Sequence, residues 1–147
     1  MRVLVQRVSR SSVAVDRRVV GQIEEGLLLL IGIHRDDDEK SLHFCAEKCV
    51  HLRIFADDEG KMNRSLLDVG GAALAISQFT LYGDCRKGRR PGFEQAARPE
   101  QAAKLYTRFV ELLTEQGVAV ECGVFGADMQ VEIHNDGPVT LMVESPV

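Results

Sequence analysis

The feature of this sequence that most constrains its fold is an uninterrupted apolar run from Gly26 to Ile33. The run is far shorter than the ~20 apolar residues that a helix needs to span a bilayer. Solid apolar runs of this length are typical of strands buried on both faces, whereas half-exposed strands alternate apolar and polar residues. We therefore expect this segment to be a central strand with other structure packed on both of its faces.

Weaker apolar patterns predict further strands on either side of this run. Before it, valines recur at close to the period of two that a half-buried strand shows: Val3, Val5, Val8, Val13 and Val15. After it, the segment from Asp57 to Gly60 is typical of a hairpin turn, and Ala72 to Ser77 is an apolar strand. Late in the chain, a strict alternation precedes Gly137-Pro138, which is interpreted as a turn before a last strand over Val139–Val143.

Two segments have the spacing of amphipathic helices. The acidic run Asp36 to Glu39 predicts a helix start, and the apolar face of that helix would be Leu42, Cys45, Cys49 and Leu52. A second helix would begin at Pro99, end at Gly117 and present Ala102, Tyr106, Phe109, Val110 and Leu113. Two helices on a larger, mainly antiparallel sheet or barrel predict a single α+β domain over residues 1–147.

A metal site on the first helix is an alternative reading of its side chains. His43 and His51 lie close in sequence to Cys45 and Cys49. At about 100° per residue the two thiols share one face and the two imidazoles point away from it, so the four cannot converge on one ion. The sequence therefore predicts two buried thiols, two surface histidines and no metal.

Composition excludes several classes of protein. The 147 residues carry 18 Lys and Arg against 22 Asp and Glu, a formal net charge of −4, so the chain cannot coat nucleic acid indiscriminately. The exception is a local basic loop: Arg86, Lys87, Arg89 and Arg90. Four cysteines without a secretion signal predict reduced thiols, no disulfide, no membrane segment and a cytoplasmic location.

Common catalytic motifs are absent, since the chain has no GxSxG, P-loop, GxGxxG or HExxH sequence. Several strings nevertheless occur in one order along nearly the whole chain: Gln6-Arg7-Val8, Ser12-Val13, Arg53-Ile54-Phe55, Gly60-Lys61-Met62-Asn63, Ser77-Gln78-Phe79-Thr80-Leu81, Arg90-Pro91-Gly92-Phe93 and Asn135-Asp136-Gly137-Pro138-Val139-Thr140. In these strings the chain resembles the D-aminoacyl-tRNA deacylases. It departs from the family at Gly92, where a Ser is common, so no side-chain role is assigned there.

The resemblance implies hydrolysis of the ester that joins a D-amino acid, or glycine, to the 3′-terminal adenosine of tRNA. It implies a homodimer in which a cis Gly137-Pro138 pair from one subunit enters a site built around Ser77 to Leu81 of the other. Main-chain carbonyls of that pair would hold the substrate ammonium and leave no volume for an L side chain. Glycine would pass the same filter. No cofactor is implied.

Within that site, Thr80 is either a nucleophile or a positioning group. No base is visible beside it in the sequence, and an unactivated hydroxyl attacks poorly at neutral pH. An aminoacyl ester already has a vicinal ribose hydroxyl, so we favour RNA-assisted catalysis with backbone N–H groups near Phe79 and Thr80 stabilising the oxyanion. Gln78 would position the substrate, Ser77 would brace the strand, and the basic loop would contact acceptor-stem phosphates.

Two other classes of function are considered. One is a non-catalytic RNA- or DNA-binding module, which the lack of Trp and the presence of only two Tyr disfavour, because few aromatic rings are available to stack bases. The other is a Thr- or Cys-dependent esterase for small molecules, for which no partner base is evident.

Overall fold

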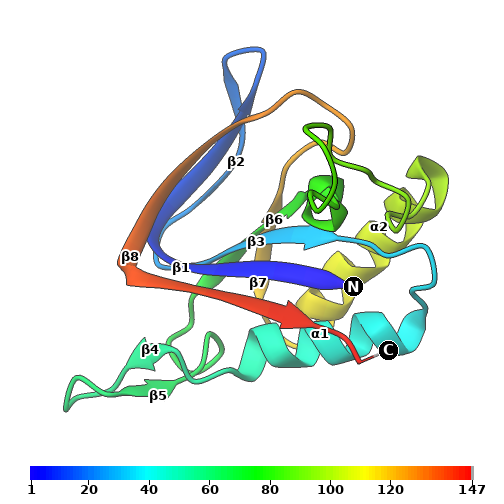
Figure 1. The fold of residues 1–147 in the computed structure, drawn as a ribbon. Helices are drawn as coiled ribbons and strands as arrows, with labels where there is room; N and C mark the ends of the chain where they lie inside the picture. The colour runs from blue at the N-terminus through cyan, green and yellow to red at the C-terminus, as the bar shows by residue number, and fades with distance from the viewer. Residues whose placement is uncertain (147) are drawn as a thin grey trace.

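The computed structural model describes residues 1–146. Its elements, in chain order (Figure 1), are β1 (Arg2–Val15), β2 (Arg18–Ile23), β3 (Gly26–Gly32), α1 (Glu39–His51), β4 (Phe55–Ala56), β5 (Met62–Arg64), β6 (Ala72–Ser77), the 3₁₀ helix η1 (Phe79–Tyr82), α2 (Pro99–Glu115), β7 (Ala119–Cys122) and β8 (Gln130–Glu144). Most strands join one twisted sheet, and the helices pack against it.

The sheet has the order β2-β1-β3-β6-β7, with β8 added along the other edge of β1. β1 pairs antiparallel with β2, β3 and β8, whereas β3–β6 and β6–β7 are parallel pairs. Parallel neighbours need a crossover connection, and α1 and α2 lie in these two connections. The far edges approach each other, since Gln22 N donates to Glu121 Oε1 at 3.4 Å. The expected α+β fold with a mostly antiparallel, barrel-like sheet is confirmed.

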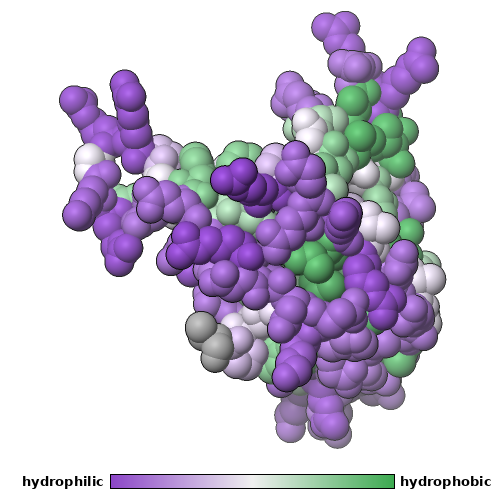
Figure 2. All heavy atoms as spheres, turned by 90° about the vertical axis from the view of Figure 1, so that its right-hand side faces the viewer, coloured by the Kyte–Doolittle hydropathy of each residue, from purple (hydrophilic) through white to green (hydrophobic). Residues whose placement is uncertain are grey.

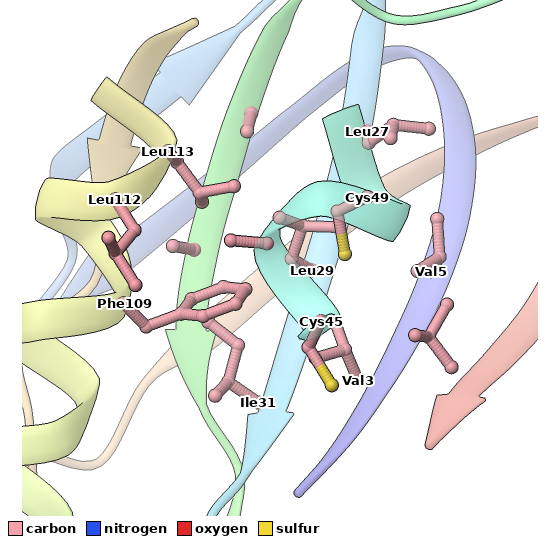
Figure 3. Close-up of a cluster of buried hydrophobic side chains, with 14 of the residues drawn as sticks. Val3, Val5, Leu27, Leu29, Ile31, Cys45, Cys49, Phe109, Leu112 and Leu113 are labelled. Atoms are coloured by element: carbon pink, nitrogen blue, oxygen red, sulfur yellow. The ribbon is translucent and has the colours of Figure 1, made fainter. Parts of the chain in front are cut away.

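The apolar run forms the central strand β3, as expected. Leu27, Leu29 and Ile31 belong to the larger core cluster on the helical side, together with Phe109 and Cys45 (Figure 3). Leu28 points to the opposite side into a smaller apolar cluster inside the curved sheet. Both faces of β3 are therefore buried, which explains why its sequence shows no polar alternation.

Both helices begin where the sequence predicts. Asp38 is the N-cap of α1: its side chain accepts from Ser41 N at 3.1 Å, and Ser41 Oγ accepts from Asp38 N. The helix ends at His51, so Leu52 is its C-cap and is not part of the helical face. Pro99 begins α2, and Gly117 follows its end with φ +94°.

Gly137-Pro138 is not a turn between two strands, which corrects the sequence prediction. Both flanking segments belong to β8 and pair with β1. Gln6 faces Thr140 and Val8 faces Asn135, so two steps along β1 match five along β8. Residues 136–139, four residues opposite the single residue Arg7, bulge out of the ladder and form what we call the Gly-Pro loop. In the sequence, an apolar-polar alternation that is interrupted by Gly-Pro looks like two separate strands. The sequence does not show that both segments pair with the same strand, β1.

Within residues 1–146, no helix is long and apolar enough to cross a membrane.

Candidate active site

The segment Ser77 to Leu81 lies where β6 ends and the chain turns into η1. Gln78 N donates to Ile31 O at 2.7 Å, which holds this turn against the end of β3. Gly32 permits the close approach, because a Cβ there would lie 3.1 Å from Leu81 Cβ and 3.3 Å from Gln78 O. The 3₁₀ helix is thereby fixed to the most buried strand of the sheet.

The side chains of this segment divide between packing and exposure. Tyr82 is buried, whereas Thr80 is exposed and Phe79 keeps 53% of its surface open. Gln78 Nε2 donates a short hydrogen bond to Thr80 Oγ1, so the two predicted site residues are in contact. Ser77 is half-buried and forms no side-chain hydrogen bond in the described part of the chain. An aromatic ring, an amide and a hydroxyl are therefore presented together at one end of the sheet.

Thr80 has no base in contact with it among residues 1–146, where Gln78 is its only side-chain partner. The nearby imidazole of His34 packs edge-on against Tyr82, with ring centroids 5.2 Å apart, and its Nδ1 accepts from Asp36 N. The amides of Phe79 and Thr80 lie in the first turn of η1, where N–H groups have no partner within the helix.

Arg2 supports η1 from the side, and sequence reasoning did not identify it. Its Nη1 donates to Leu81 O at 2.9 Å, and its guanidinium lies 4.6 Å from the centroid of the Tyr82 ring. Its Nε is 3.4 Å from Glu144 Oε1 on β8. Nothing in the sequence around Arg2 indicates that it contacts residues as distant along the chain as Leu81 and Glu144.

The basic loop lies beside η1. Asp84 and Gly92 close it with two backbone hydrogen bonds of 2.7 and 2.9 Å, and Phe93 packs edge-on against Phe79 with centroids 5.1 Å apart. Arg86 is held within the loop by Asp84, through bonds of 2.9 and 2.7 Å that lower the pKa of this carboxyl to about 2.

Among the described residues, the other three basic side chains of the loop, Lys87, Arg89 and Arg90, form no ion pair. All three are exposed. Of the four predicted tRNA contacts, these three therefore have no acidic partner among residues 1–146, whereas Asp84 already compensates the charge of Arg86.

The Gly-Pro loop has its own supports on β1 and β8. The Gly137-Pro138 bond is cis, and Gly137 has φ +120°, where an added Cβ would lie 2.9 Å from Arg7 Nη2. Arg7 Nε donates to Asp136 O at 3.2 Å. Asn135 Nδ2 donates to Arg7 O and to Val139 O, at 2.9 and 3.1 Å. Both residues occur in strings noted in the sequence, but only the structure assigns them this contact.

The two halves of the candidate site lie apart within one chain. Arg2 contacts η1 and Arg7 contacts the Gly-Pro loop, and both belong to β1. Five residues of strand at about 3.4 Å each separate the Cα atoms of these two arginines by roughly 17 Å. A single chain therefore brings Ser77 to Leu81 together with the basic loop, and leaves Gly137-Pro138 at a different place on the surface.

The thiols and imidazoles of α1 are arranged as the sequence predicts. Cys45 and Cys49 are buried, and burial raises the pKa of both thiols, that of Cys45 to about 12. His43 and His51 are exposed and pair with Glu39 and Glu47 one turn away, at 3.0 and 3.5 Å. In the part of the chain that the structure describes, no group of three His, Cys, Asp or Glu could hold a metal ion.

Comparisons with known proteins agree on one family. Residues 4–144 match the profile of the family described as D-Tyr-tRNA(Tyr) deacylase. D-aminoacyl-tRNA deacylases from Shouchella clausii (strain KSM-K16) and Fervidobacterium nodosum (strain ATCC 35602 / DSM 5306 / Rt17-B1) are 62% and 59% identical over 145 residues. These alignments cover 99% of this chain and 99% and 97% of those proteins.

Two solved structures share the fold. The c-Myc DNA Unwinding Element Binding Protein has a TM-score of 0.95 and 41% identity, with full coverage of both chains. A probable eukaryotic D-amino acid tRNA deacylase has a TM-score of 0.80 and 22% identity, and the alignment covers 97% of this chain and 98% of that chain. At this identity the likeness concerns the fold alone.

Fold, site and relatives together define the class as hydrolases that act on the ester bond of aminoacyl-tRNA. Within that class, this chain belongs to the D-Tyr-tRNA(Tyr) deacylase family.

Proposed function

We propose that this deacylase is a homodimer in which the Gly-Pro loop of each subunit completes the site at Ser77 to Leu81 of the other. The observation that carries the proposal is that these two segments lie apart within one chain. Phe79 and Thr80 are exposed in one segment and Gly137-Pro138 in the other, and each segment accepts a hydrogen bond from an arginine of β1. A two-fold axis would bring each loop to the partner's η1 and so create two identical sites.

The outer edge of β8 supports this assembly. Among residues 1–146, β8 pairs with β1 alone, which leaves a long edge of backbone N–H and C=O groups unpaired. Apolar side chains on the same strand are exposed: Ile133, Leu141 and Met142, at 40, 40 and 45%. Unprotected strand edges associate readily, and covering this one would bury the apolar side chains as well.

Selection by chirality would follow from this arrangement. The Gly-Pro loop consists of main chain that Arg7 and Asn135 hold in place, so it cannot move aside as a flexible side chain would. Main-chain carbonyls of Gly137 and Pro138 would accept hydrogen bonds from the substrate ammonium and occupy the volume of an L side chain. A glycyl ester, which has no side chain, would pass, so glycyl-tRNA mischarged on tRNA-Ala is a second proposed substrate.

Catalysis would rely on the RNA. Among residues 1–146 no base bonds Thr80, whereas the amides of Phe79 and Thr80, which have no partner within η1, could stabilise the oxyanion that forms when the ester carbonyl is attacked. The vicinal 2′-hydroxyl of the terminal ribose would position or activate the attacking water, and Gln78 would orient the substrate. The bond broken is the ester between the amino acid and the ribose, and the products are free tRNA and D-amino acid.

Mixed dimers test whether the site is shared between subunits. Thr80→Arg fills the exposed site beside η1, and Gly137→Ala places a Cβ against Arg7 in the Gly-Pro loop. We expect each homodimer to be inactive, and a purified dimer of one copy of each to regain about half of wild-type deacylation, because one of its two sites is intact. A mixed dimer as inactive as its parents would refute the shared site.

Neutralising the free charges of the basic loop tests its contact with tRNA. We expect Lys87, Arg89 and Arg90, changed together to Gln, to weaken tRNA binding and to lower the slope of log affinity against log salt by roughly two units. Turnover at saturating tRNA should change little. Arg86→Gln is the matched control and should alter the slope less, because Asp84 already compensates this charge.

Binding to DNA is a second candidate function, because the structural relative at 41% identity is named for a DNA element. The chain's formal net charge of −4 restricts any such contact to the basic loop. The same salt titration with a DNA duplex in place of tRNA separates the two candidates, and tighter binding to the duplex would favour the second.

A further inference from the structure

The hairpin of β4 and β5 projects from the body of the protein (Figure 1). These two strands form a sheet of their own, and the turn between them contains Gly60 with φ +79°. We call residues 55–64 the arm. Phe55 anchors it in the core, but beyond that residue most side chains are exposed, and Met62 keeps 57% of its surface open. A two-stranded hairpin with no packing is at best marginally stable in water, so an arm that keeps its shape needs further support.

Internal hydrogen bonds make the arm rigid. Asp57 Oδ1 accepts from Glu59 N and Lys61 N at 2.9 and 3.0 Å, which lowers the pKa of this carboxyl. Asn63 Nδ2 donates to Asp57 Oδ2 at 3.4 Å, and Arg64 Nη2 donates to Asp58 Oδ1 at 2.9 Å. The arm therefore holds one shape while its apolar side chain at Met62 is left in water.

Arg7 joins the arm to the Gly-Pro loop. Its Nη1 donates to Ile54 O, at the base of the arm, at 2.7 Å, while its Nε donates to Asp136 O in the loop. An open groove of about 310 Å³ lies between arm and body, lined by Arg7, Ser9, Glu25, Phe55, Ala56 and Asp136. The arm and the Gly-Pro loop thus form two walls of the same groove. A molecule that receives the loop would therefore lie beside the arm as well.

The charge of the arm favours a protein over RNA as its occupant. Residues 55–64 carry two basic and three acidic side chains, so the arm has a formal charge of −1. The basic groups Lys61 and Arg64 already face Glu59 and Asp58, at 3.8 and 2.9 Å. Phosphate binding needs uncompensated cations, whereas a hairpin with no excess positive charge and an exposed methionine matches the composition of protein interfaces.

We propose that the arm clasps the second copy of this chain, with Met62 buried against the partner subunit. This rests on the proposed shared site, because the loop that enters the partner and the arm are tied together through Arg7. The arm would close over the subunit that receives the loop and so fix the depth at which Gly137 and Pro138 enter its site.

Site-specific photocrosslinking of the full-length protein tests the contact directly. A benzophenone amino acid replaces Met62 in one sample and Lys104, an exposed residue of α2, in the control. We expect irradiation at position 62 to yield a product with the mass of two chains, and position 104 to yield none. With tRNA present, a product of one chain with RNA at position 62 would overturn the proposal in favour of an RNA contact.

Dimer affinity is the second measurement, by sedimentation over a dilution series. We expect Met62→Glu to weaken the dimer at least about tenfold, because symmetry places the change in the interface twice. Lys61→Glu, the exposed neighbour, should leave the affinity within about twofold. A monomeric wild-type protein would refute the shared site itself, whereas a stable dimer that lacks the crosslink and is indifferent to Met62→Glu would refute the arm contact alone.

Discussion

Removing the 2′-hydroxyl of the terminal adenosine is expected to slow hydrolysis of a D-aminoacyl-tRNA at least about a thousandfold, while Thr80→Ala loses far less and keeps substantial activity. The reason is the environment of Thr80. Its one side-chain contact among residues 1–146 is the Gln78 amide, which donates to Oγ1 and cannot accept the hydroxyl proton. The RNA hydroxyl is adjacent to the ester and needs no positioning by the protein.

The measurement is single-turnover deacylation of D-tyrosyl-tRNA with a normal or a 2′-deoxy terminal adenosine, by wild-type and Thr80→Ala enzyme. Loss of one hydrogen bond should cost Thr80→Ala about 1–2 kcal/mol, or roughly five- to thirtyfold. Thr80→Ser is the matched control and should stay close to wild type. A folded but dead Thr80→Ala enzyme, a trappable acyl-enzyme and efficient cleavage of the deoxy substrate would instead make Thr80 the nucleophile.

The second large effect is stereochemical. We expect D-tyrosyl-tRNA to be hydrolysed at least about a hundredfold faster than L-tyrosyl-tRNA, since the L side chain would overlap the main chain of the partner's Gly-Pro loop. Glycyl-tRNA should be cleaved at a rate near that of the D substrate. Equal rates on the two tyrosyl substrates would refute the filter.

The rigidity of the loop can be tested within the same assay. Arg7→Met removes the hydrogen bond to Asp136 O and the bond to Ile54 O, so the loop should yield to an L side chain and the D-to-L ratio should fall. Arg10→Met is the matched control on the same strand, since among residues 1–146 the Arg10 side chain bonds the exposed His134 alone. An unchanged ratio in Arg7→Met would mean that Arg7 does not set the selectivity.

Exposed apolar side chains are concentrated in a few parts of the surface. Figure 2 shows a face that is hydrophilic over most of its area, with hydrophobic atoms gathered near the projection at the upper right and in a central patch. Outside the core, apolar side chains with large exposed fractions occur on the tip of the β1–β2 hairpin, at η1 and on β8, for example Val19, Phe79 and Met142. The latter two lie in the segments that the proposed dimer would bring together.

Local patterns determined much of the architecture. The solid run that became β3, the acidic start of α1 and the proline that begins α2 each act within a few residues, so their effect can be predicted from neighbours in sequence. The valine pattern also held, and its break between Val5 and Val8 coincides with the register shifts of β1 against β8. Residues 77–81 and 137–138 were located by likeness to a family and not by any local rule.

What the sequence by itself determined is therefore most of the elements, most of the buried faces and the family. The tertiary structure decided how distant segments meet: Arg2 on Leu81, Arg7 between the arm and the Gly-Pro loop, and β8 as one bulged strand. It also decided that η1 and Gly137-Pro138 lie at different places in one subunit. The physical reason is that helix starts and strand periods arise from interactions between near neighbours, whereas these contacts join residues as far apart in sequence as Arg2 and Glu144 and exist only once the sheet has formed.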